Sequence, residues 1–139
     1  MTNTKTSRLI VLNVCWLAGA AWATAMGYTA LMVSGDKSMM SYLIAILVAA
    51  SIAASFWTGK HLLRAAWLCS VLGFLGTLIG IMAGLIGGHD LTSQAGLLAT
   101  GSDLFAGVGT AFSSTIVGTF GMIWLWTLAQ ARVDDWEVV

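Results

Sequence analysis

The sequence predicts an all-α membrane protein with four transmembrane helices and both termini in the cytoplasm. Three observations predict this class. Hydrophobic residues make up 58% of the 139 residues and charged residues only 9%, whereas soluble domains carry about 25% charge. Four apolar stretches each approach or exceed the ~20 residues that a membrane-spanning helix needs. The charges fall almost entirely between and outside these stretches, which excludes a disordered chain, a basic nucleic-acid binder and an ordinary soluble enzyme.

Each apolar stretch defines one expected span. The four spans cover residues 9–33, 39–57, 65–87 and 104–130. The first two form a peripheral segment, 1–64, which includes an inner loop. The last two form a core unit, 65–139, which ends in a short cytoplasmic tail. The first stretch is longer than the 7–15 residues of a signal-peptide core, which favours a retained helix.

The distribution of Lys and Arg predicts the orientation, because short cytoplasmic loops carry an excess of both. With the termini inside, five basic residues fall on the inner side: Lys5, Arg8, Lys60, Arg64 and Arg132. Only Lys37 falls on the outer side. This bias predicts a multi-pass protein of a bacterial-type inner membrane. Four tryptophans at the inner ends of spans agree with an interfacial belt.

A stripe of small residues marks the third and fourth spans. In the third span it consists of Gly73, Gly76, Gly80 and Gly84, with Gly88 beyond them. In the fourth span it includes Gly107, Ala111 and Gly118. Such spacing places the small residues on one helix face, where they let the backbones of membrane helices approach closely. We therefore expect these two spans to pack face to face.

The fourth span also carries five hydroxyl groups within ten residues: Thr110, Ser113, Ser114, Thr115 and Thr119. Hydroxyls can bond to carbonyls of their own helix, so both a packing role and a polar path stay open. Thr77 lies ten residues from Trp67, or ~15 Å, and Thr115 nine residues from Trp124, or ~14 Å. Both threonines therefore lie near the middle of a ~30 Å hydrocarbon core.

Ionisable groups are missing from the interior of every expected span. Proton and ion paths across a bilayer depend on such a group, so a partner would have to supply it. Asp103, at the outer edge of the fourth span, is interpreted as a helix cap. His89 and Asp90 are too few for a metal site, and no phosphate-binding or nucleophile motif occurs. We expect no enzyme activity, metal or cofactor.

Two motifs in the last two spans resemble the MotA/TolQ/ExbB proton-channel family. Residues 72–81, LGFLGTLIGI, are similar to the family's L-G-x-x-G-T-x-x-G-[IL] signature, and residues 111–118, AFSSTIVG, to its A-[LF]-x-x-T-x-x-G stretch. The resemblance implies a homopentameric ring around the single spans of a partner of the MotB/TolR/ExbD type. The partner's intramembrane Asp would carry H⁺ or Na⁺ past Thr77 and Thr115. Thr110 and Ser114 would extend that polar wall.

Three features differ from the family. Thr110 stands where some members have a glutamate, no proline lies near the last span, and a short inner loop replaces a large cytoplasmic insert. Flagellar members push on a rotor with that insert, so we expect mechanical work to be delivered to the outer side through the partner, as in the TolQ and ExbB branch. The four-span layout is closer to the flagellar branch, and both branches stay open. Two alternatives to this ion-driven motor stay open, namely a non-conducting membrane scaffold of the same fold and a small holin-like pore-former.

Overall fold

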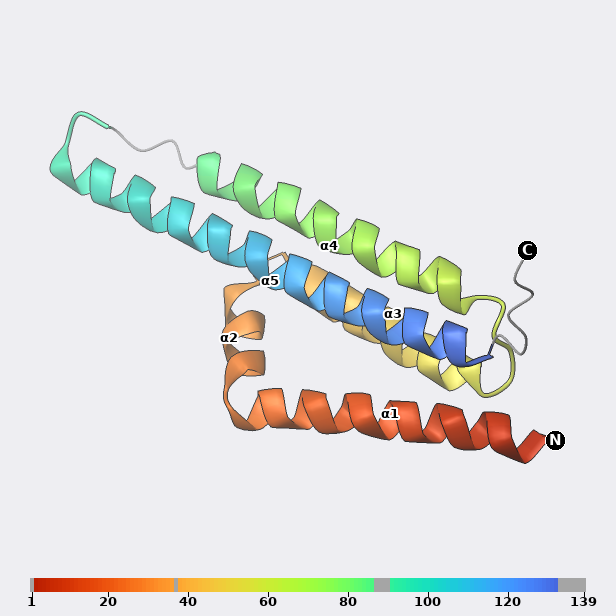
Figure 1. Ribbon diagram of the computed structural model, residues 1–139. Coiled ribbons are helices and arrows are strands. Elements are labelled where there is room, and N and C mark those ends of the chain that lie inside the picture. The colour runs from red at the N-terminus through yellow and green to blue at the C-terminus, as the bar shows by residue number, and fades with distance from the viewer. Residues whose placement is uncertain (1, 37, 87–90, 133–139) are drawn as a thin grey trace.

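A computed structural model describes residues 2–36, 38–86 and 91–132 (Figure 1). Lys37, Gly88, His89, Asp90 and the predicted cytoplasmic tail after Arg132 lie outside these ranges. The described residues are mostly helical and include no strand. Its helices are α1 (Thr2–Ala25), α2 (Tyr28–Gly35), α3 (Met40–Ser55), α4 (Leu62–Leu85) and α5 (Gln94–Arg132).

Three of these helices are long and apolar enough to cross a membrane: α1 from Thr6 onward, α4 and α5. This indicates a membrane protein. The second expected span corresponds to α3, which has 16 residues. At ~1.5 Å per residue this helix is ~24 Å long, shorter than a ~30 Å hydrocarbon core. The number of four spans therefore stays a prediction.

The first expected span, 9–33, is not one continuous helix. α1 ends at Ala25, Gly27 adopts a left-handed conformation with φ 83°, and α2 then turns away from α1 (Figure 1). Glycine adopts this conformation without the steric cost that other residues meet. Thr24 Oγ1 and Thr29 Oγ1 share a 2.9 Å hydrogen bond across the turn. Hydropathy did not reveal the break because the apolar pattern continues through it.

The last helix begins well before the start of the expected span 104–130. α5 begins at Gln94, where the Ser93 hydroxyl accepts a 3.0 Å hydrogen bond from the Gly96 N–H, as an N-cap residue does. Its 39 residues extend over ~58 Å, far more than a ~30 Å core. Asp103 therefore lies inside α5, and its interpretation as a helix cap is wrong.

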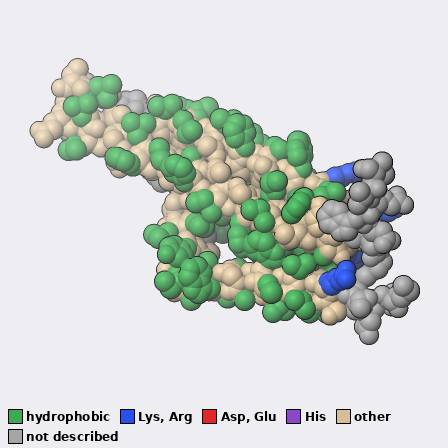
Figure 2. Space-filling view, viewed as in Figure 1, with side chains coloured by type: hydrophobic (Ala, Val, Ile, Leu, Met, Phe, Trp, Pro, Cys, Tyr) green, Lys and Arg blue, Asp and Glu red, His purple; other side chains and the backbone are tan. Residues whose placement is uncertain are grey.

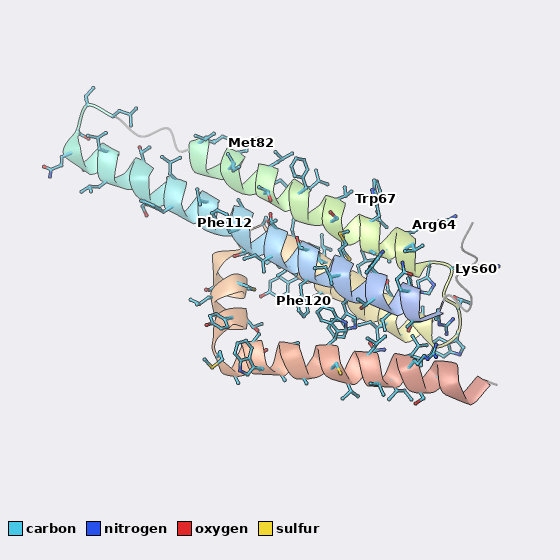
Figure 3. The ribbon with its side chains drawn as sticks, viewed as in Figure 1. Lys60, Arg64, Trp67, Met82, Phe112 and Phe120 are labelled. Atoms are coloured by element: carbon cyan, nitrogen blue, oxygen red, sulfur yellow. The ribbon has the colours of Figure 1, made fainter. Side chains whose placement is uncertain are left out.

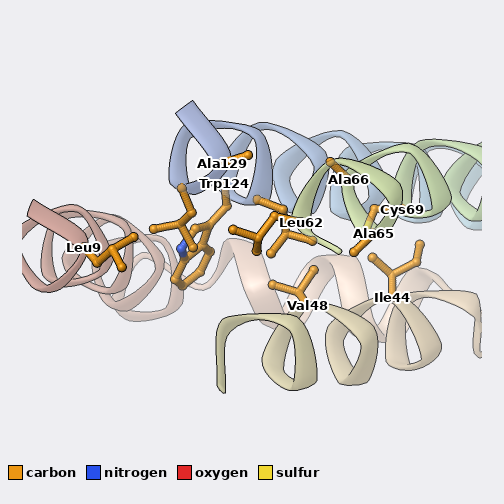
Figure 4. Packing of buried hydrophobic residues seen from close by; sticks show 11 residues of the cluster. Leu9, Ile44, Val48, Leu62, Ala65, Ala66, Cys69, Trp124 and Ala129 are labelled. Carbon is orange, nitrogen blue, oxygen red and sulfur yellow. The ribbon is translucent and has the colours of Figure 1, made fainter. Parts of the chain in front are cut away.

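The helices form an antiparallel α4–α5 pair, with α3 packed on both helices and α1 on α5 (Figure 1). Buried side chains that include Leu9, Ile44, Leu62 and Trp124 fill the space between them (Figure 4). The start of α1, the connection from α3 to α4 and the end of α5 lie at one end of the molecule.

The described basic side chains belong to this same end: Arg8, Lys60, Arg64 and Arg132. On the face drawn in Figure 2, Lys and Arg side chains gather there. This clustering agrees with the Lys and Arg bias, since one membrane surface would meet all four. We call this end the basic end.

Candidate functional site

The α4–α5 contact is built from the small residues of both helices. Gly73, Gly76, Gly80 and Gly84 on α4 are buried, as are Gly107, Ala111 and Gly118 on α5. A Cβ atom added at Gly107 would lie 2.5 Å from the carbonyl oxygen of Gly80. One added at Gly118 would lie 2.8 Å from the Gly73 Cα. The backbones thus touch directly, and no larger side chain fits between them.

This close contact brings Thr77 and Thr115 together in one subunit. Thr77 Oγ1 is hydrogen-bonded to Thr115 Oγ1, and it also lies 3.0 Å from the carbonyl oxygen of Gly73. The carbonyl of Ala111 accepts from Thr115 Oγ1 at 2.9 Å and lies 3.3 Å from Thr77 Oγ1. Each hydroxyl has one proton and two lone pairs. The pair therefore keeps acceptor capacity for a group outside the subunit.

The Thr77–Thr115 pair lies on an outward-facing surface of the two helices. Thr115 is exposed and Thr77 half-buried. Phe74 and Phe112, each three residues before one of the threonines, share their faces and are 61% and 65% exposed. Phe112 on α5 is labelled in Figure 3. We call the surface formed by these four residues the threonine face.

Thr110 and Ser114 do not belong to the threonine face. Thr110 is 3% exposed, and its hydroxyl donates to the carbonyl of Gly35 at 2.8 Å. Ser114 is fully buried, and its hydroxyl lies 3.1 Å from the carbonyl oxygens of both Thr110 and Ala111. Both side chains point into the subunit, where backbone carbonyls satisfy them. In this arrangement they do not extend the polar wall that the sequence predicts.

A second polar contact, which the sequence analysis missed, holds α1 against α5. The indole N–H of Trp124 donates to Asn13 Oδ1 at 3.1 Å, and that of Trp16 donates to Thr127 Oγ1 at 3.0 Å. The rings of Trp16 and Trp124 stack with centroids 5.9 Å apart, and Phe120 meets both edge-on. The sequence feature that could have indicated this contact is Asn13, whose amide side chain lies within an otherwise apolar stretch.

The charged residues of α4 and α5 lie away from the middle of the two helices, at Arg64, Asp103 and Arg132. No Asp, Glu, Lys, Arg or His occurs in residues 65–86 or 104–131. Among the described residues, no group of three potential metal ligands comes together. The threonine face can therefore donate and accept hydrogen bonds, but it has no acid or base of its own.

Comparisons with protein families, curated proteins and solved structures found no match to this chain. The resemblance to the MotA/TolQ/ExbB family therefore depends on the two motifs and their order in the sequence.

Proposed function

We propose that the chain is the ring subunit, or stator, of a proton- or sodium-driven motor in a bacterial-type inner membrane. In this proposal five copies enclose the single spans of a partner that carries an intramembrane Asp. Ion flow past the ring is coupled to mechanical work on the outer side. The observation that carries the proposal is the Thr77–Thr115 pair on the threonine face.

The chemistry of the pair suits an ion path that lacks a carboxylate of its own. A threonine hydroxyl can donate to the partner's ionised Asp, and its lone pairs can accept from the protonated Asp or coordinate Na⁺. One group thus serves both states of a carboxylate that takes up and releases an ion. Because Thr115 is exposed, its hydroxyl can rotate from the Ala111 carbonyl toward a partner.

The surroundings of the pair suit a partner helix. The glycines of the two stripes pack against the neighbouring helix within the subunit. They are therefore not available for packing against another chain. Phe74 and Phe112 stand outward on either side of the hydroxyls. Large apolar side chains around a few polar groups would exclude water from the partner's carboxylate and strengthen each hydrogen bond to it.

The subunit number provides the first test. Native mass spectrometry of the purified protein should find five copies, with or without the partner. A monomer or dimer as the largest species would contradict the ring. Expression of the chain without a partner separates the alternatives, because a holin-like pore-former would permeabilise the membrane, whereas a closed ring or a scaffold would not.

Ion flux through the complex with the co-purified single-span protein provides the second test. Thr77→Val and Thr115→Val should abolish flux while the ring still assembles, and Thr77→Ser and Thr115→Ser should retain it. Thr100→Val is the matched control, because Thr100 lies on α5 with Thr115 and its hydroxyl donates to the carbonyl of Gly96 in the same helix at 2.9 Å. Normal flux in both valine variants at the pair would overturn its role and favour a scaffold.

A further inference from the structure

We infer that the subunit binds one acyl chain of a membrane phospholipid in a groove between α1 and α3. Two cavities, of about 300 and 230 Å³, form this groove. The larger lies between α1, α3 and α5, and the smaller between α1, α2 and α5. Val117 and Phe120 of α5 line both cavities, which therefore adjoin along this helix. We call the two cavities together the acyl groove. Binding in this groove does not depend on the proposed motor.

The acyl groove exists because α1 and α3 pack against α5 at different distances. A Cβ atom added at Gly121 of α5 would lie 2.7 Å from Val48 Cγ2, so α3 approaches α5 closely. On the other side, the rings of Trp16 and Trp124 stack between α1 and α5 with centroids 5.9 Å apart. Phe120 extends from α5 toward α1 and meets Trp16 edge-on (Figure 3). These rings hold α1 away from α5 and leave space between α1 and α3.

The lining of the acyl groove is apolar. The described residues that line the two cavities include no charged side chain. Thr24 Oγ1 and Thr29 Oγ1 are bonded to each other, and Thr24 Oγ1 also donates to the carbonyl of Ala20 at 2.8 Å. The indole N–H of Trp124 donates to Asn13. A buried water molecule needs about two to four polar partners, which these bonded groups do not provide. An apolar molecule is therefore the expected occupant.

The size of the acyl groove excludes a helix from another chain. One turn of a helix with a diameter of ~10 Å and a pitch of ~5.4 Å occupies ~400 Å³, which is more than either cavity holds. The larger cavity nevertheless has about twice the volume of a dry apolar cavity of ~150 Å³ that binds benzene. The groove therefore fits a narrow apolar chain. Lipid tails, which are as apolar as leucine side chains, are the narrow apolar chains that surround a membrane protein.

The acyl groove also has the depth of one leaflet. Along α5 it runs from Ile116 to Trp124, which are eight residues or ~12 Å apart. Ile116 follows Thr115, which the spacing from Trp124 places near the middle of a ~30 Å core. The acyl chains of one leaflet fill half of that core, or ~15 Å. The groove therefore suits a phospholipid of the inner leaflet, whose head group would lie toward the basic end.

The experiment titrates the delipidated full chain in detergent with phosphatidylcholine and counts bound lipids by native mass spectrometry. The head group of this lipid has no net charge, so the basic end does not attract it. We expect one saturable phospholipid per subunit, and binding weaker by about fivefold or more in Ala45→Leu/Ala49→Leu. Both alanines line the groove and are exposed, so larger side chains would fill it. The matched control is Ala50→Leu/Ala53→Leu, which changes two exposed alanines of α3 outside the lining and should bind as the wild type does.

Three results would overturn the site. The first is a wild-type chain that binds no phospholipid, and the second is equal binding by the groove-filled variant and the wild type. The third is loss of the oligomer instead of the lipid in that variant, which would assign the groove to a neighbouring copy.

Thermal unfolding at or above the wild-type temperature would show that the groove-filled variant is folded. If it is not folded, Ala23→Leu narrows the smaller cavity from α1, and unchanged binding by this variant would equally overturn the site. The measurement uses neither the partner nor an ion gradient. Its failure would therefore leave the ring proposal standing, and normal flux in the threonine variants would leave the acyl groove standing.

Discussion

The α4–α5 contact and the α1–α5 contact hold helices together in different ways. In the first, glycines let backbone touch backbone along most of α4. In the second, two indole N–H groups bond to Asn13 and Thr127 within a stack of aromatic rings. Apolar cavities of about 300 and 230 Å³ remain between α1 and its neighbours. In a membrane, where burial of apolar groups drives little association, the α4–α5 contact depends on close packing and the α1–α5 contact on a few polar bonds.

This difference has a consequence for function. The proposed ring subunit would need one surface that holds its hydroxyls in place, and the close backbone packing of the α4–α5 pair suits this need. The segment α1–α2 can shift relative to that pair at smaller cost, because fewer atoms must separate. We expect α1 to respond to lipid or to neighbouring subunits while the threonine face keeps its geometry. Four predictions follow from these contacts and from the connections between the helices, from the largest expected effect to the smallest.

The largest effect is expected for Gly107→Ala. The added Cβ would meet the Gly80 carbonyl and the Gly84 backbone at 2.5–2.9 Å, and backbone cannot rotate away. We expect a loss of about 1–3 kcal/mol or more in the free energy of unfolding, measured by SDS titration in mixed micelles. Gly109→Ala is the control, since nothing lies within 4 Å of its added Cβ. Its stability should stay equal or rise by up to ~1 kcal/mol. Equal losses in both variants would contradict close packing at Gly107.

Gly27→Ala tests the turn between α1 and α2. Space is available around Gly27, but its φ of +83° is unfavourable for any residue with a Cβ. We expect a loss of about 1–2 kcal/mol from backbone strain alone, measured by the same titration. Gly19→Ala is the matched control, because Gly19 also has open space around it but has the ordinary helical backbone of α1. An equally stable Gly27→Ala would argue that α1 and α2 form one straight helix in the membrane, as the sequence analysis predicted.

The bonds between α1 and α5 are tested by Asn13→Leu and Thr127→Val. Each change is close to isosteric and leaves one indole N–H without its acceptor. Polar contacts between membrane helices are worth about 0.6 kcal/mol on average and up to ~1.7, so we expect a loss of about 1 kcal/mol for each. Hydrogen exchange should increase in α1 and stay unchanged in α4. Equal increases in both helices would show that α1 and the α4–α5 pair unfold as one unit.

The smallest effect concerns Asp36 and pH. Burial opposes ionisation of this carboxyl, but hydrogen bonds from Ser38 and Ser41 outweigh it and lower its pKa from the usual 3.8. Ionised Asp36 therefore stabilises the α2–α3 connection fully above pH 3.8, and this contribution is lost as pH falls through the folded-state pKa. Thermal unfolding in detergent between pH 6 and about 3 should show the loss. Asp36→Asn should remove that part of the pH dependence, and an unchanged pH profile would contradict the assignment.

Much of the α4–α5 core followed from the sequence. The glycine spacing predicted which faces meet, because only residues without a Cβ allow such close approach. Counting residues from the interfacial tryptophans placed Thr77 and Thr115 at one depth, and antiparallel packing then joined them. Their partner, the ring and the ion remain predictions. Neither motif could show that Thr110 and Ser114 point inward, since that direction depends on where α2 and α3 pack.

Composition and spacing by themselves determined an apolar helical protein with five of its six basic residues predicted at one end and a glycine-packed pair of helices at its centre. Only the tertiary structure decided where helices break or continue. The turn at Gly27 depends on one dihedral angle, and the N-cap at Ser93 depends on one hydrogen bond. Hydropathy, which is averaged over many residues, detects neither. The same extension of α5 placed Asp103 against the last turn of α4. Asp103 thus changed from an interpreted helix cap to a residue inside α5 that lies beside Gly84 of α4, because the start of the helix and its neighbouring helix define the surroundings of this residue.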